Sequence, residues 1–211
     1  MAKRAHDGPP LTWIRPPGPI ADGLRIGLLG GSFDPAHEGH LHVSDTALRA
    51  LKLDYVWWLV SPGNVLKPVP GALAARLAGA RALANGRRVV VSDIETRLGT
   101  RYTADTVAAL QRRFPHVTFI WLMGSDNLEQ FSHWRRWRQI AARVPIAVVR
   151  RPGSVLASLR APLARLTGVS RRLGCAPSLA VLDGRRSWQS STCLREQALG
   201  AAAEAMLNPT L

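Results

Sequence analysis

The sequence predicts an α/β protein built around a doubly wound, mostly parallel sheet with helices on both faces. Runs of β-branched, aromatic and other apolar residues recur at 24–29, 55–60, 88–92, 117–123, 144–149 and 179–182. Between them lie segments with apolar residues at helical spacing, such as Leu41, Leu48 and Leu51. Strands that are apolar on both faces and alternate with helices are typical of a parallel sheet that helices cover on both sides.

The strand-to-helix corners are the places where such a sheet binds ligands. Ligands lie outside the carboxyl ends of the strands, where helix N-termini present unbonded amides. In chain order, the corners with unusual residues are 30–42, 61–68, 99–106 and 124–137. A last helix is expected over 187–207, with its start signal at 190–192.

Length and composition indicate a single domain. At 211 residues, the chain is long enough for one buried core and too short for two full ones. We expect one domain over 24–211, preceded by a proline-rich, flexible extension over 1–23. No apolar run reaches the roughly 18 residues of a membrane-spanning helix, and the N-terminus lacks the apolar core of a secretory signal. We therefore expect a cytoplasmic protein with reduced cysteines, and assign no function to Cys175 and Cys193.

The net charge of +14 suggests nucleic-acid binding at first, because a basic surface attracts phosphate backbones. The Arg-Arg pairs that carry much of this charge are scattered along the chain and are not gathered on one predicted helix. A dedicated nucleic-acid-binding protein is therefore the weaker interpretation, and no membrane partner is expected.

The first corner contains two histidines behind a strand that ends in glycine. His37 and His40 are three residues apart and share one face of the first helical turn. A metal site of the His-Glu-x-x-His type needs a spacing of four, so metal ligation is the weaker interpretation, as are incidental surface histidines. Two imidazoles at a helix N-terminus can donate N–H groups to phosphate, and Gly30 and Gly31 let a phosphate approach the main chain. The corner is thus predicted to bind phosphate.

Residues 30–40 resemble the GG(T/S)FDPxHxGH signature of the nucleotidylyltransferase superfamily. This resemblance implies a Rossmann-like fold and a site for ATP formed by Gly30, Gly31, Ser32, Phe33, His37 and His40. Residues 190–195 resemble a second superfamily motif, (I)SSTxIR, with Gln189 in place of the isoleucine. It implies that ATP is also bound by Ser190, Ser191, Thr192 and Arg195, and that Arg195 acts in catalysis together with His37 and His40. Taken alone, the second stretch is typical of an ordinary helix N-cap.

Three further stretches resemble the nicotinate-nucleotide adenylyltransferases. Residues 99–106 are similar to their (G)xSYTxDT, 122–128 to (I)MGADNL and 131–137 to FxxWxxW. The resemblance, which covers Leu24 to roughly Leu199, implies that nicotinate mononucleotide is bound by Tyr102, Thr103, Asp126, Trp134 and Arg135. It implies that Trp134 stacks on the nicotinate ring while the main-chain amides of Thr103 and Arg135 take the carboxylate. The alternative is that the tryptophans are core anchors, which we accept for Trp137.

The loop at 61–68 corresponds to a family loop that often reads PxxPPHK. It lacks the histidine and keeps Lys67. A flexible cation there can close over phosphates as a further catalytic group, and the alternative is a solvated surface lysine.

The resemblance implies transfer of the AMP moiety of ATP to nicotinate mononucleotide, which gives deamido-NAD (nicotinate adenine dinucleotide) and pyrophosphate in NAD biosynthesis. Mg²⁺ is expected to be bound mainly through the ATP phosphates, with no metal ligand from the protein. The nearest alternative is an enzyme for nicotinamide mononucleotide or another small phosphate; phosphopantetheine is disfavoured because it explains neither 99–106 nor Trp134. A nucleotide sensor or RNA-binding protein on the same fold is a more distant alternative. The sequence leaves the oligomeric state open, a homo-oligomer included.

Overall fold

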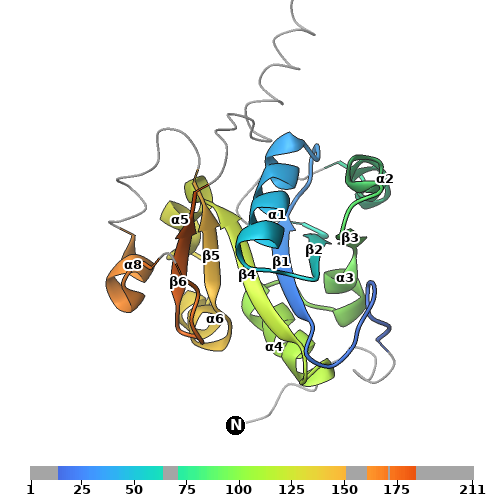
Figure 1. Cartoon of the computed structure of the whole chain (residues 1–211). Helices are drawn as coiled ribbons and strands as arrows, with labels where there is room; N and C mark the ends of the chain where they lie inside the picture. Colours follow the sequence, from blue (N-terminus) through green and yellow to red (C-terminus); the bar gives the residue numbers. More distant parts are fainter. Residues whose placement is uncertain (1–13, 64–70, 151–160, 171, 184–211) are drawn as a thin grey trace, which may run out of the picture.

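Six strands form one sheet in which every neighbouring pair is parallel, in the order β3-β2-β1-β4-β5-β6 (Figure 1). The computed structural model describes residues 14–63, 71–150, 161–170 and 172–183. The strands are β1 (Arg25–Gly31), β2 (Tyr55–Val60), β3 (Val89–Ser92), β4 (Thr118–Gly124), β5 (Ile146–Val149) and β6 (Leu179–Leu182). The predicted doubly wound parallel sheet is confirmed, and each predicted run forms a strand. The strand order reverses between β1 and β4, which is the switch point where such sheets bind ligands.

Helices cover both faces of the sheet, because successive residues of each strand point to opposite faces. On one face lie α1 (Glu38–Ala50) and α2 (Leu73–Ala84). On the other lie α3 (Ile94–Leu98), α4 (Thr103–Arg113), α5 (Ser125–Phe131), α6 (Trp137–Arg143) and α8 (Pro162–Thr167). In β4, Ile120 and Leu122 pack on the α1 side, while Trp121 and Met123 pack on the α4 side. The continuously apolar strands of the sequence thus serve two buried cores.

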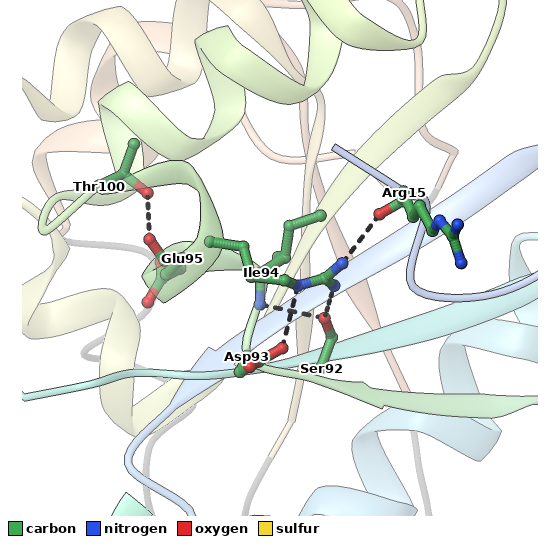
Figure 2. Close-up of polar contacts among 7 residues, drawn as sticks. Arg15, Ser92, Asp93, Ile94, Glu95 and Thr100 are labelled. Carbon is green, nitrogen blue, oxygen red and sulfur yellow. Dashed lines mark hydrogen bonds and ion pairs between the residues drawn. The ribbon is translucent and has the colours of Figure 1, made fainter. Parts of the chain in front are cut away.

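Residues 14–23, predicted to belong to a flexible extension, pack against the domain. Ile14 is 5% exposed, and its carbonyl accepts a hydrogen bond from Nε of Arg113 (3.2 Å). The carbonyl of Arg15 accepts one from Nη1 of Arg97 (3.0 Å), and Figure 2 shows that carbonyl beside the end of β3. The prolines of this segment restrict the unfolded chain, which lowers the entropy lost on ordering. Residues 14–23 thus form a strap, a segment without regular structure that lies over the α4 side of the core.

Two predicted segments of the fold lie outside the described residues. These are the helix over 187–207 and residues 1–13 of the extension. Within the described part of the chain, no helix is long and apolar enough to cross a bilayer.

Candidate active site

The carboxyl ends of β1 and β4 bring two of the predicted corners together. β1 and β4 are hydrogen-bonded neighbours, and they end at Gly31 and Gly124. The loop after β1 leads into α1, and α5 begins directly after β4. The histidine corner and the corner that carries Asp126 therefore share the switch point of the sheet, as the fold predicts.

His37 and His40 close the N-terminus of α1 with their own side chains. Nδ1 of His37 accepts from the amide of Gly39 (3.0 Å), and Nδ1 of His40 accepts from the amide of His37 (3.2 Å). An imidazole that accepts at Nδ1 carries its proton on Nε2 when neutral, so both rings are held in the form that donates from Nε2. The ring centroids are 3.9 Å apart. The structure thus keeps the predicted pair together at a helix N-terminus, with the donor chemistry that phosphate oxygens need.

Aromatic packing supports the histidine pair from the side of the core. The ring of Phe33 lies 4.5 Å from that of His40 and 5.0 Å from that of Trp58. The indole N–H of Trp58 donates to the Ser44 hydroxyl (2.8 Å), which donates to the carbonyl of His40 (2.8 Å). Phe33 is fully buried and has a φ of +50°, a conformation that costs about 1–3 kcal/mol for a side chain of this size. The side chain of Phe33 therefore packs against His40 and supports its position. Because that side chain is buried, only the main chain of Phe33 is left to contact ATP.

At the end of β1, the space that a side chain would need is occupied differently at Gly30 and at Gly31. A Cβ atom at Gly30 would lie 2.7 Å from Cη2 of Trp121, so the indole of β4 occupies that space. At Gly31 a Cβ atom would lie 3.4 Å from the Phe33 ring and 3.9 Å from Nε2 of His40. The missing side chain thus leaves space beside the imidazole at Gly31 and space for the Trp121 indole at Gly30, while the approach of phosphate to the main chain stays a prediction for both.

Arg76 of α2 is a structural residue of the site that sequence reasoning missed. Its buried guanidinium donates to the carbonyls of Ser32 (2.6 Å) and Ser61 (2.9 Å), and Nε donates to the carbonyl of Gly71 (2.8 Å). The Asp34 carboxylate accepts from the amide of Gly71 (3.1 Å). Burial lowers the pKa of Arg76, and attraction to Asp34 opposes that shift. These bonds join the loop after β1 to the loop after β2, and Asp34 takes part in this link.

A signal for Arg76 was present in the sequence. Leu73, Leu77 and Ala80 form an apolar stripe at helical spacing, and Arg76 stands within that stripe. A charged residue on the buried face of a helix is rarely tolerated unless it has partners, so its position indicated a buried network.

Three of the residues predicted to bind the mononucleotide, Tyr102, Thr103 and Arg135, lie together at the start of α4. Tyr102 precedes the helix, and its carbonyl accepts from the amides of Asp105 (2.9 Å) and Thr106 (3.1 Å). The Arg135 guanidinium lies 4.6 Å from the centre of the Tyr102 ring, and Arg136 forms an ion pair with Asp105. The turn before α4 and the segment between α5 and α6 are therefore neighbours.

Trp134 is half-buried and packs on the core. Its ring lies edge-on to Trp121 at 5.9 Å and 5.3 Å from Phe131. Trp137 also contacts Phe131, at 6.0 Å. The anchor role accepted for Trp137 thus extends in part to Trp134, and stacking on a ligand remains for the part of Trp134 that is exposed. Asp126 is exposed in the first turn of α5.

Glu95 is a second residue that sequence reasoning missed. It lies in α3 and is 7% exposed, and its Oε1 accepts from the Thr106 hydroxyl (3.1 Å). The hydroxyls of Thr100 and Thr106 are 2.9 Å apart. Burial raises the pKa of Glu95 to about 7, and the hydrogen bond from Thr106 opposes the shift. The sequence signal was an acidic residue between Ile94 and Leu98, directly before the 99–106 motif.

The remaining predicted site residues lie outside the described part of the chain. They are Lys67, Ser190, Ser191, Thr192 and Arg195. Among the residues that are described, no three His, Cys, Asp or Glu side chains form a group that could hold a metal ion.

Comparison with known proteins gives consistent sequence matches. The family profile described as Cytidylyltransferase-like matches residues 28–197. A protein of Parvibaculum lavamentivorans named "Probable nicotinate-nucleotide adenylyltransferase" is 54% identical over 189 residues, which cover 84% of this chain and 94% of the relative. A protein of Gluconobacter oxydans with the same name is 59% identical over 185 residues, covering 82% of this chain and 94% of that relative.

Solved structures share the fold at low sequence identity. The nicotinic acid mononucleotide adenylyltransferase of Plasmodium falciparum, complexed with NaAD, gives a TM-score of 0.66 at 17% identity and covers 82% of this chain and 83% of its own. The same protein complexed with APC gives 0.64 at 16% identity, with the same coverage of both chains. The profile match and the relatives above show that the chain belongs to the Cytidylyltransferase-like family and, within it, to the nicotinate-nucleotide adenylyltransferases.

Proposed function

We propose that the enzyme transfers the AMP moiety of ATP to nicotinate mononucleotide and releases deamido-NAD and pyrophosphate, as a step of NAD biosynthesis. The observation that carries this proposal is that Trp121 of β4 links two chemically different groups, because its indole lies beside Gly30 on one side and edge-on to Trp134 on the other. The imidazole pair at α1 suits a triphosphate, and the turn before α4, with Arg135 and Trp134 beside it, suits a flat acidic ring. The names of the relatives support the same substrates.

The ATP half is formed by the loop after β1 and the start of α1. His37 and His40 donate from Nε2 to phosphate oxygens, and the amides and dipole of the helix N-terminus add to that attraction. Gly31 and Ser32 present main-chain groups to the same phosphates. By resemblance, Ser190, Ser191, Thr192, Arg195 and Lys67 complete this half.

The mononucleotide half is formed by the start of α4 and the segment before α6. The amides of Thr103 and Arg135 receive the nicotinate carboxylate, and the exposed part of Trp134 contacts the ring. The Tyr102 ring and the Arg135 guanidinium hold each other in place through their cation–π contact. Asp126 lies in the first turn of α5, directly after β4.

The transfer is a single in-line displacement. A 5′-phosphate oxygen of the mononucleotide forms a bond to the α-phosphorus of ATP, and the bond from that phosphorus to the bridging β-oxygen breaks. The bridging oxygen leaves with the bonding electrons as part of pyrophosphate. Because the attacking group is already an anion, positioning and charge neutralisation supply most of the rate, and no strong base is required.

Mg²⁺, when bound, neutralises phosphate charge during the transfer. We expect ATP phosphates and water to hold most of this ion's coordination positions, because Mg²⁺ loses its water reluctantly. A cytoplasmic location is part of the proposal, since ATP is available there.

The proposal is tested by pyrophosphate release from ATP with three acceptors offered side by side. We expect rapid release with nicotinate mononucleotide, slower release with nicotinamide mononucleotide and none with phosphopantetheine. Equal or faster release with the amide would contradict the assignment of the carboxylate site. RNA binding that falls with salt, without pyrophosphate release from any acceptor, would favour the nucleic-acid alternative.

A further inference from the structure

Glu95 is attached to both ends of the turn that joins α3 to α4. Its main-chain carbonyl accepts from the amide of Thr100 (2.9 Å) and lies 3.4 Å from the Thr100 hydroxyl. Figure 2 shows Glu95 and Thr100 facing each other across this turn. On the α4 side, the carboxyl of Glu95 accepts from the Thr106 hydroxyl (3.1 Å). Residues 101–105 therefore lie between two attachments to a single buried residue.

The same turn carries the groups proposed to receive the mononucleotide. The first amides of α4 that bond to the carbonyl of Tyr102 are those of Asp105 and Thr106. The amides of Thr103 and Ala104 come before them, and in a helix such leading amides are the ones that an anion can use. The Thr106 hydroxyl also lies 3.4 Å from the Tyr102 carbonyl. A displacement of Thr106 would therefore shift the start of α4.

We propose that Glu95 is a positioning residue for the mononucleotide, which acts through Thr100 and Thr106 to fix the main-chain amides at the start of α4. This inference rests on the proposed function and adds to it a residue that touches no substrate. A buried acid also suits this place, because its neutral form does not repel a carboxylate bound nearby. The histidine pair is held by its own contacts around α1, so the inference concerns the mononucleotide and not ATP.

The experiment compares separate KM values for ATP and nicotinate mononucleotide in matched variants. Thr106→Val removes the hydroxyl at nearly constant shape, and Glu95→Ala removes its acceptor. We expect either change to raise the KM for the mononucleotide about tenfold and to leave kcat and the KM for ATP within about twofold. Glu95→Gln keeps an acceptor oxygen and is expected to restore the KM for the mononucleotide to within about threefold of wild type.

Thr46→Val is the matched control. Thr46 lies in α1, and its buried hydroxyl has no hydrogen-bond partner in the described part of the chain. The same chemical change there is expected to alter neither KM.

If Thr106→Val and Glu95→Ala are folded by circular dichroism and change both KM values by the same factor, or change neither, Glu95 has no positioning role. Should Glu95→Ala not fold, Thr106→Val alone decides. A wild-type enzyme that releases no pyrophosphate with nicotinate mononucleotide would overturn the proposed function together with this inference, and that result is known before any variant is compared.

Discussion

The two halves of the site are held by contacts of different range. In the ATP half, the imidazoles of His37 and His40 bond to main-chain amides within the same helical turn. In the mononucleotide half, Arg135 reaches Tyr102 from another segment and Glu95 reaches Thr106 from another helix. The contacts of the histidine pair form as soon as the first turn of α1 folds. The contacts of Arg135 and Glu95 form only when distant elements pack together correctly. We therefore expect the mononucleotide half to respond to changes far from the ligand, and the ATP half to respond mainly to its own residues.

The largest effect is expected from His40→Ala, which removes one phosphate donor and the acceptor for the amide of His37. Loss of a donor to the charge that develops in transfer lowers kcat/KM by about a hundredfold to a thousandfold. Steady-state pyrophosphate release measures it. His116→Ala, a change at an exposed histidine before β4, is the control that should keep wild-type rates. Near-normal rates for a folded His40→Ala variant would contradict the expectation that the ATP half depends on its own residues.

Arg76→Met tests a long-range contact of the ATP half. Three carbonyls lose a buried donor, and we expect the free energy of unfolding to fall by about 3 kcal/mol. Urea unfolding gives that value. Arg81→Met, at an exposed position of the same helix, should change it by less than about 0.5 kcal/mol. Equal effects of the two variants would mean that the loops after β1 and β2 do not depend on Arg76.

The ionisation of Glu95 gives the mononucleotide half a pH dependence. Its pKa rises from 4.5 to about 7 on folding, so between these values the folded protein binds the proton more tightly than the unfolded chain. This contribution to stability is fully present below pH 4.5 and is lost as pH rises through about 7, a change on the order of 3 kcal/mol.

Urea unfolding of wild type and Glu95→Gln at several pH values isolates this contribution. The difference between the two proteins should shift in favour of the variant as pH rises from 5 to 8. A difference that stays constant over that range would show that Glu95 is ionised throughout.

The smallest effect is expected from Trp134→Ala. Loss of one stacking partner raises the KM for nicotinate mononucleotide about tenfold, and the KM for ATP should stay unchanged. Trp137→Ala serves as the comparison, because its ring packs on Phe131 and its loss should lower the melting temperature with little effect on either KM. An unchanged KM for the mononucleotide in Trp134→Ala would make both tryptophans core anchors.

The same difference in range explains what could be predicted from sequence. The six strands were readable because each is apolar on both faces, and the His37–His40 pair because its spacing and glycines lie within a dozen residues. Arg76 and Glu95 were not found, since their partners lie on other elements and only their placement on apolar helix faces hinted at burial. The strap at 14–23 was also misjudged, because proline content indicates a lack of regular structure and says nothing of the carbonyls that Arg97 and Arg113 hold.

The most direct test of this division is the binding of each substrate alone, measured by titration calorimetry with wild type, His40→Ala and Thr106→Val. The account predicts a crossed pattern: His40→Ala weakens Mg²⁺-ATP and keeps nicotinate mononucleotide, while Thr106→Val weakens the mononucleotide about tenfold and keeps ATP. If both variants weaken both ligands by the same factor, the site is one unit and the separation into two halves is wrong.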